Sequence, residues 1–230
     1  MSVIETNNLQ KRYQVGENSV HAVDGVDLNI REGEFVCISG RSGSGKSTLL
    51  SLLAGLESPT DGEVVILGKH LEQMNEQERG RFRRDHIGFI FQAYNLLPQF
   101  SSWENVAVPL EIRGIPLEQR REKAMEALEM VGLRDHAEHR PTELSGGQQQ
   151  RISIARAIIT RPGIVFADEP TGNLDSRTGT DVMSLLTDLF RRWGTTFLVV
   201  SHDEDMNRYT DREIRLKDGK IERIYLREEC

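Results

Sequence analysis

Hydrophobic and polar positions follow two different patterns along this chain. Over residues 20–31, Val26, Leu28 and Ile30 alternate with polar neighbours, and this period of two predicts a half-buried strand. Elsewhere the apolar runs are short and unbroken, which is typical of buried strands. These runs predict strands over 35–39, 64–67, 87–91, 164–167 and 197–200.

Helical patterns occupy several of the stretches between these runs. Residues 47–54, 118–130 and 178–193 predict helices. The third has an apolar stripe on one face, formed by Val182, Leu185, Leu186, Leu189 and Trp193. Because residues from about 93 to 150 carry few strand signals, we expect a helical insertion there.

Near the end of the chain, Asp218-Gly219 predicts a two-residue hairpin turn. Such a turn would place Leu216 opposite Ile221, and Arg215 opposite Glu222. Apolar strands that alternate with helices predict a mostly parallel sheet covered on both faces. The alternating strands near both ends add an antiparallel part, so we expect an α/β fold.

The composition is that of a folded protein with an acidic surface. Its 230 residues are 37% hydrophobic and 28% charged, with a formal net charge of −7. Since there is no basic tail or arm, we expect no binding to nucleic acid. The densest basic cluster, at Arg79, Arg81, Arg83 and Arg84, predicts a solvated face, with contact to lipid headgroups or a membrane partner as the alternative.

Neither secretion nor membrane insertion is predicted. The acidic start has too few apolar residues for a signal peptide, and no apolar run approaches the roughly 20 residues that span a bilayer. Two cysteines cannot define a disulfide framework. We expect Cys37 to be buried and Cys230 to be mobile, and a reducing cytoplasm suits both.

A glycine-rich motif lies between the predicted strand 35–39 and the predicted helix 47–54. It consists of Gly40, Arg41, Ser42, Gly43, Ser44, Gly45, Lys46, Ser47 and Thr48. The pattern and its strand–loop–helix context match a phosphate-binding P-loop, whose glycines let backbone N–H groups turn toward the phosphates. We expect Lys46 to reach the β- and γ-phosphates of a nucleotide, and the Ser47 hydroxyl to bind Mg²⁺.

Two carboxylates follow the apolar strand 164–167. Asp168 stands at the strand end, where it can hold Mg²⁺, usually through water. Glu169 can polarise a water in line with the γ-phosphate. Alone, the pair would equally well cap a strand before Pro170, but a P-loop in the same chain favours the catalytic interpretation.

A second glycine-rich motif is Leu144-Ser145-Gly146-Gly147-Gln148. Ser145 and Gln148 form a capping box that opens a helix. Gly146 and Gly147 are poor helix formers, so we expect something, such as a phosphate, to approach the backbone closely there. One nucleotide site does not need two such loops, and the two motifs together suggest a site completed by another copy of the protein.

Three further side chains are candidates by position. Gln92 and His202 follow predicted strands, at the ends where ligands bind in open α/β sheets. A lone Gln or His is more commonly structural. Tyr13 is a lone aromatic near the N-terminus, for which simple packing is the better interpretation on physical grounds.

Together these motifs resemble the nucleotide-binding subunits of ATP-binding cassette (ABC) transporters, over essentially the whole chain. Leu144–Gln148 matches the signature motif of that family. The resemblance implies a P-loop NTPase (RecA-like) core with a mostly parallel sheet, an N-terminal antiparallel β part and an inserted α-helical lobe. It implies a single domain over 1–230, with the core at about 1–92 and 151–230 and the lobe at about 93–150.

The resemblance also implies a head-to-tail dimer that sandwiches ATP between the P-loop of one subunit and the signature helix of the other. Tyr13 would stack on adenine, and Gln92 would contact Mg²⁺ and the attacking water. Glu169 would be the catalytic carboxylate, His202 the switch histidine near the γ-phosphate, and Asp175 part of a loop that crosses the interface. None of these residues departs from the family pattern, so the resemblance implies an active, Mg²⁺-dependent ATPase.

Shorter motifs at 91–98, 104–110 and 172–175 look like those of the bacterial lipoprotein-release and macrolide-exporter group. Members of this group typically work with a permease of four membrane helices per subunit that carries a large extracytoplasmic domain. They often transmit force across the membrane. We expect the permease to contact a surface near Leu96, Leu97, Phe100 and Trp103, although about half of these residues would serve as core instead. The protein would then lie on the cytoplasmic face of the inner (plasma) membrane.

Other functions stay open at this point. The chain could serve another ABC system such as an importer, or be a soluble cassette ATPase of DNA repair or translation. The soluble class usually carries two cassettes or long coiled coils, and neither occurs here. A GTPase is not favoured because no Asn-Lys-x-Asp motif is present, and the complete set of polar residues argues against an inactive scaffold.

Overall fold

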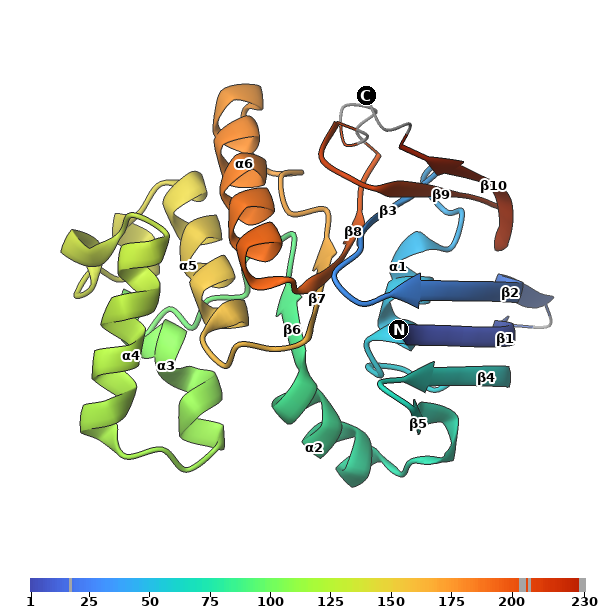
Figure 1. Cartoon of the computed structure of the whole chain (residues 1–230), viewed down its shortest axis with the longest axis horizontal. Coiled ribbons are helices and arrows are strands. Elements are labelled where there is room, and N and C mark those ends of the chain that lie inside the picture. The colour runs from blue at the N-terminus through green and yellow to red at the C-terminus, as the bar shows by residue number, and fades with distance from the viewer. Residues whose placement is uncertain (17, 203–205, 207, 228–230) are drawn as a thin grey trace. The chain divides into compact units, whose positions relative to one another are not determined.

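The computed structural model describes residues 1–16, 18–202, 206 and 208–227. It divides into two compact units, the first formed by Met1–Arg83 and Gly194–Cys230 and the second by Arg84–Trp193 (Figure 1). The lobe expected at about 93–150 falls inside the second unit, whose bounds are wider, and the limits of the lobe stay a prediction. Cys37 is buried, as expected, whereas Cys230 lies outside the described residues.

An antiparallel sheet forms one part of the first unit, with strand order β2-β1-β4-β5. Its strands are β1 (Ser2–Val15), β2 (Asn18–Arg31), β4 (Asp61–Ile66) and β5 (Lys69–His70). The half-buried strand predicted at 20–31 is confirmed. We did not predict β1, because its pairing shifts register near Ile4 and Leu9 and buries the neighbours Val3 and Ile4 together, which hides the period of two.

A second set of strands in this unit surrounds β3 (Phe35–Ser39). It pairs in parallel with β8 (Thr196–Val200) and β9 (Arg212–Lys217), and β10 (Lys220–Leu226) adds an antiparallel edge. Phe35 lies opposite Phe197 with the ring centroids 4.6 Å apart. The buried positions of β3 and β8 are the unbroken apolar runs of the sequence, so the parallel arrangement is confirmed.

The predicted hairpin between β9 and β10 is present, and its turn lies where we expect it. One of the two predicted residue pairs is confirmed and the other is wrong. Asp218 and Gly219 have positive φ values of 48° and 77°, as a type I′ turn requires. Leu216 lies opposite Ile221 as expected. The expected Arg215–Glu222 pair is wrong: the register shifts between Ile221 and Arg223, and Arg215 pairs with Arg223.

Two helices and a short 3₁₀ turn accompany these strands. Helix α1 (Lys46–Leu53) confirms the helix after the glycine-rich motif and buries Leu49, Leu50, Leu52 and Leu53. Turn η1 (Leu71–Gln73) leads to α2 (Glu76–His86). Helix α2 was not predicted, because Phe82 is its one buried residue and the rest of it is polar.

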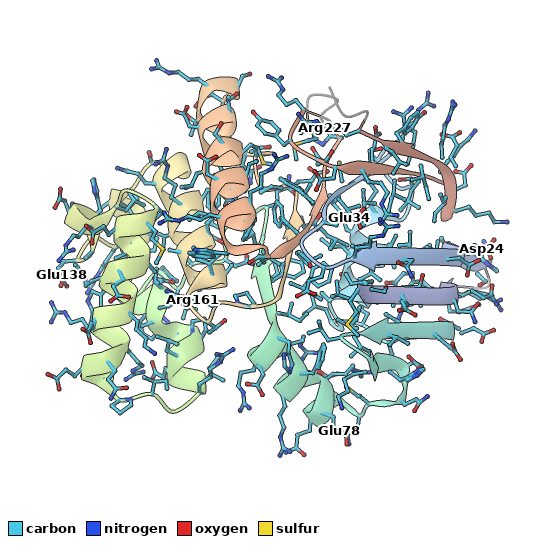
Figure 2. All side chains as sticks on the ribbon, viewed as in Figure 1. Asp24, Glu34, Glu78, Glu138, Arg161 and Arg227 are labelled. Carbon is cyan, nitrogen blue, oxygen red and sulfur yellow. The ribbon has the colours of Figure 1, made fainter. Side chains whose placement is uncertain are left out.

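The arginines of α2 are largely paired with neighbouring acidic groups. Arg79 and Arg83 donate to Glu76 at 2.9 and 2.8 Å, and Arg84 donates to Asp85 at 2.8 Å. These pairs favour the solvated-face interpretation of the basic cluster. Other charged side chains also project outward, for example Glu78 and Glu138 (Figure 2).

The second unit joins two parallel strands to a set of packed helices. Strand β6 (Ile87–Ile90) pairs with β7 (Ile164–Asp168). The helices are α3 (Ser102–Ile112), α4 (Leu117–Met130), α5 (Gly146–Ile158) and α6 (Ser176–Trp193), with the 3₁₀ turns η2 (Arg134–His136) and η3 (Pro141–Glu143). Helices α3, α4 and α5 pack on one another (Figure 1). The helices predicted at 118–130 and 178–193 are thereby confirmed.

The apolar stripe of α6 differs from the prediction in two members. Val182, Leu186 and Leu189 are buried as expected, but Leu185 and Trp193 are only half-buried. Met183 and Phe190 complete the buried face instead. None of the helices that the structure describes is long and apolar enough to cross a membrane.

Asn105 ties the segment before α3 to that helix. The side chain is fully buried, and its Oδ1 accepts the Leu97 N–H at 2.7 Å. Its Nδ2 lies within hydrogen-bond distance of the carbonyls of Leu97, Phe100 and Ser101, at 3.0–3.2 Å. One amide therefore satisfies several backbone groups of a loop that has no regular structure.

Replacing Asn105 with Leu leaves these buried backbone groups without a partner. We expect the free energy of unfolding to fall by about 2–4 kcal/mol, measured by urea denaturation followed through tryptophan fluorescence. Gln119→Leu, at an exposed position of α4, is the control and should change stability by less than about 0.5 kcal/mol. Equal effects of the two changes would show that the amide network does not stabilise the segment.

Candidate functional site

The glycine-rich loop between β3 and α1 has a backbone that only glycine can adopt. Gly40, Gly43 and Gly45 have φ values of 144°, 79° and 98°. A Cβ at Gly40 would overlap the Leu216 carbonyl oxygen, and one at Gly45 would overlap the Ala22 carbonyl oxygen. At Gly43, by contrast, no described residue other than its chain neighbours has a heavy atom within 4 Å of the Cβ position, so the loop is open on that side.

Helix α1 begins without a side-chain cap. Gly45 occupies the N-cap position, and the Leu49 N–H donates to the Gly45 carbonyl at 2.8 Å. The N–H groups of the first turn have no partner inside a helix. They and the positive end of the helix dipole suit a bound anion.

Lys46 and Ser44 are two buried polar side chains of the loop that could contact a bound anion. The Lys46 side chain is mostly buried, and its Nζ donates to the carbonyls of Gly40 and Arg41 at 2.9 and 3.0 Å. The Ser44 Oγ is buried and has no hydrogen-bond partner in the described part of the chain. A polyphosphate would supply acceptors for both groups, so the loop fits the phosphates of a nucleotide.

A hollow of about 1070 Å³ opens beside this loop in the first unit. Gly40–Ser44 line it together with His202, Glu213 and Arg215. The structure thus brings His202 to the loop, although its role near a γ-phosphate stays a prediction. Glu213 also accepts a hydrogen bond from the Ser39 hydroxyl at the end of β3.

Tyr13 lies near the first turn of α1 in the same unit. Its hydroxyl donates to the Glu57 carboxylate at 2.6 Å, and Lys11 Nζ lies 5.2 Å from the ring centroid. Burial raises the pKa of Tyr13, the Glu57 bond raises it further, and a hydrogen bond with Thr48 lowers it. The ring is therefore anchored beside the loop, and stacking on adenine stays a prediction.

The second unit carries the two carboxylates. Asp168 ends β7, and Glu169 follows it with a positive φ of 43°, which is strained for a residue other than glycine. Gln92 Nε2 donates to Glu169 Oε2 at 3.2 Å. The structure therefore brings together two predicted site residues that are 77 positions apart in the sequence.

Two neighbouring residues that we had not assigned to the site support this pair. A Cβ at Gly172 would lie 2.9 Å from Gln92 Nε2 and 3.3 Å from Glu169 Oε2, so glycine leaves room for the contact. Asn173 Nδ2 donates to the Gln92 carbonyl at 2.9 Å. Apart from the family motif at 172–175, the sequence offers only the turn composition of 170–173, which by itself predicts only a loop.

The second glycine-rich motif opens α5, and its capping box is confirmed. Gln148 N–H donates to Ser145 Oγ at 3.3 Å, and Ser145 N–H donates to Gln148 Oε1 at 2.9 Å. Unlike α1, this helix has a side-chain cap. The N–H groups of Gly146 and Gly147 belong to its first turn.

The close approach expected at the two glycines is present, but the chain itself supplies it. A Cβ at Gly147 would overlap the methyl group of Thr178, and one at Gly146 would lie 3.0 Å from the Tyr94 hydroxyl. Packing within the unit therefore explains why residue 147 is glycine, and it leaves little room beside Gly146. A phosphate at this helix start stays a prediction.

Asp175 fixes the side chain that meets Gly147. Its Oδ2 accepts the Thr178 hydroxyl at 2.6 Å and its Oδ1 accepts the Thr178 N–H at 3.1 Å. These bonds lower the pKa of Asp175. Thr178 was missed in the sequence because its contact with Gly147 joins separate segments and leaves no local pattern.

Several of these groups suit Mg²⁺. Among the described residues, no three His, Cys, Asp or Glu side chains gather as a ready-made metal site. Mg²⁺ commonly binds one or two carboxylates together with substrate phosphates. The predicted ligands Ser47, Gln92 and Asp168, a hydroxyl, an amide and a carboxylate, are the hard oxygen donors that this ion prefers.

The sequence is similar to that of many known proteins. The family described as "ABC transporter" matches residues 23–172. The chain is 45% identical to the ABC transporter ATP-binding protein YtrE of Bacillus subtilis, over 95% of this chain and 96% of that protein. It is 44% identical to the lipoprotein-releasing system ATP-binding protein LolD of Pseudomonas fluorescens, over 96% and 97%.

A solved structure has the same fold. It is a dimer of the ATP-binding cassette MJ0796, a protein of Methanocaldococcus jannaschii, in a post-hydrolysis state bound to ADP and Pi. It superposes with a TM-score of 0.92 at 44% identity, over 99% of this chain and 100% of that chain. The expected cassette fold, with a P-loop core, an antiparallel N-terminal sheet and a helical lobe, is confirmed.

Replacing Gly147 with Ala separates helix propensity from packing. Propensity alone would stabilise the helix by about 1 kcal/mol, whereas overlap with the Thr178 methyl should destabilise the protein by about 1–3 kcal/mol. We expect the destabilisation, measured by urea denaturation.

Thr178→Ser is the matched partner, because it removes the methyl and keeps the hydroxyl that binds Asp175. In this background Gly147→Ala should cost at least about 1 kcal/mol less. A cost that does not depend on residue 178 would contradict the packing argument.

Proposed function

The chain belongs to the ABC transporter family, and we propose that it is the ATP-hydrolysing subunit that drives a membrane permease of the lipoprotein-release, macrolide-export or mechanotransmission type. The observation that carries this proposal is an uncapped helix start behind an open glycine loop, in a chain that also holds a signature helix. The ADP and Pi bound to the MJ0796 cassette support ATP as the substrate.

In the proposed reaction, the P-loop holds ATP. Lys46 would exchange its carbonyl partners for β- and γ-phosphate oxygens, and the N–H groups of the first turn of α1 would bind phosphate. Mg²⁺, held by Ser47, Asp168 and Gln92 with the phosphates, would neutralise charge on the phosphate chain.

Glu169 would act as the general base. Its carboxylate takes a proton from a water whose oxygen bonds to the γ-phosphorus, while the bond to the β–γ bridging oxygen breaks. The products are ADP and inorganic phosphate. The contact with Gln92 and the room left by Gly172 hold the carboxylate in one orientation, and His202 would stabilise the charge that develops on the γ-phosphate.

A second copy would complete each site. In this arrangement Ser145 and Gly147 of one subunit approach the γ-phosphate held by the other, and Asp175 lies near the shared interface. The dimeric structures of the MJ0796 cassette support this proposal. ATP would then close the dimer, and hydrolysis would reopen it.

The segment after Gln92 is suited to carry that change to a permease. Arg156 donates to the carbonyls of Tyr94 and Asn95 at 2.6 Å each, and the Asn105 network holds its far end. Four of its larger side chains are half-buried, namely Leu96, Leu97, Phe100 and Trp103. Each can therefore pack inward and still meet a partner.

A membrane partner is supported by the printed names of the relatives. LolD proteins of three bacteria, which are 43–45% identical to this chain, are called lipoprotein-releasing system ATP-binding proteins. By the resemblance of its shorter motifs, the permease would have four membrane helices per subunit and a large extracytoplasmic domain. The protein would lie on the cytoplasmic face of the membrane that holds the permease.

Replacing Glu169 with Gln tests the base directly. The amide keeps the size of the side chain and cannot accept the proton, so ATP hydrolysis should fall by at least about 100-fold, measured as phosphate release. ATP should still bind, and the bound dimer should accumulate in gel filtration.

The matched control is Glu118→Gln, an exposed carboxylate of α4, which should hydrolyse ATP at the wild-type rate. Near wild-type turnover of Glu169→Gln would exclude Glu169 as the base.

A further inference from the structure

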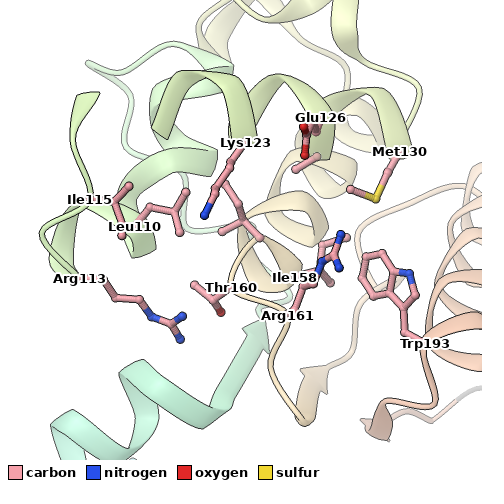
Figure 3. A pocket seen from close by; sticks show the side chains of 12 residues that line it. Leu110, Arg113, Ile115, Lys123, Glu126, Met130, Ile158, Thr160, Arg161 and Trp193 are labelled. Atoms are coloured by element: carbon pink, nitrogen blue, oxygen red, sulfur yellow. The ribbon is translucent and has the colours of Figure 1, made fainter. Parts of the chain in front are cut away.

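A pocket of about 370 Å³ opens in the second unit, and none of its residues belongs to the proposed ATP site. The ends of α3, α5 and α6 and one face of α4 surround it (Figure 3). Leu110, Ala127 and Ile158 line it and are almost fully buried. Half-buried Ile115 and Trp193 add further apolar surface.

Three cations share this apolar space with one carboxylate. Arg113, Lys123 and Arg161 line the pocket from three different elements, and Glu126 is the acidic group among the lining residues. Figure 3 shows Lys123 descending from α4 and the Arg161 side chain beside the Trp193 ring. Arg113 differs, because its guanidinium already donates to the carbonyls of Arg84 and Asp85 at 2.6 and 3.2 Å. In the described part of the chain, no carboxylate lies within 4 Å of the charged nitrogens of Lys123 or Arg161. Such a positive pocket is conspicuous on a chain with a net charge of −7.

The backbone at Arg161 is strained. Its φ is 48°, in the left-handed region that glycine and asparagine favour at the end of a helix. Its guanidinium lies 6.0 Å from the centroid of the Trp193 ring. Glycine or asparagine would form this turn with less strain. We therefore infer that the arginine is present for its side chain, which stacks on tryptophan at the cavity.

We propose that this pocket binds a small amphiphilic anion, with a carboxylate or phosphate head and an apolar body. Lys123 and Arg161 would bind the head, and the apolar wall would cover the body. The volume lies within the roughly 300–1,000 Å³ of small-molecule sites. An apolar molecule without charge would leave Lys123 and Arg161 without an acidic partner, so the site selects anions.

Trp193 makes the test direct. The chain has two tryptophans, so Trp103→Phe leaves Trp193 as the sole reporter within the full-length protein. Octanoate, titrated below its micellar concentration, should change the Trp193 emission with saturation. It should bind at least about tenfold more tightly than 1-octanol, because the alcohol lacks the charge.

Two variants locate the head group. Arg161→Asn keeps a residue that tolerates positive φ, and Lys123→Gln keeps an unbranched polar side chain without the charge, so neither should unfold the protein. Each should weaken octanoate binding by about five-fold or more. Arg121→Gln, on the same helix but outside this pocket, should leave it unchanged.

Three results would overturn the proposal: a Trp193 fluorescence change that does not saturate with octanoate, equal affinities for octanoate and octanol, or an octanoate affinity that neither substitution changes. Neither ATP nor a permease takes part in the experiment. Its outcome is therefore independent of the proposed ATPase function.

Discussion

Helices α1 and α5 both begin where the backbone packs so closely against its neighbours that there is no room for a side chain. Gly40 and Gly45 pack against carbonyl oxygens of neighbouring strands, which sets the loop before α1 and leaves its N–H groups uncapped. At α5 the constraint is similar, since Gly147 fits beneath the Thr178 methyl that Asp175 holds in place. Glycine here serves close packing as much as flexibility, and the proposed contacts of backbone N–H groups with phosphate depend on it.

A second constraint holds the residues around the proposed base. Glu169 keeps a strained backbone and contacts Gln92, and Asn173 binds the carbonyl of Gln92. The segment that follows is held by Arg156 and Asn105. A movement of the Glu169 carboxylate would therefore be passed on through hydrogen-bonded groups of the same unit. The proposed coupling to a permease requires such a connection.

Much of the fold could be predicted from the sequence because burial is regular in its strands. Unbroken apolar runs identified β3, β7 and β8, and a period of two identified β2. Strand β1 could not be predicted because bulges bury the neighbours Val3 and Ile4 together. Helix α2 could not be predicted because it buries only Phe82. The motifs located the site residues, but contacts such as Thr178 with Gly147 exist only in the folded chain and leave no local signal.

Mixing two inactive variants tests most directly whether the P-loop and the signature motif act between copies. Lys46→Ala should lose phosphate binding and Ser145→Arg should lose the signature contact, so each alone should hydrolyse almost no ATP. A mixed dimer holds one intact pairing, and an equal mixture should recover about one quarter of the wild-type rate. No recovery, despite mixed dimers demonstrated by cross-linking, would contradict the account, as would full activity of Ser145→Arg alone.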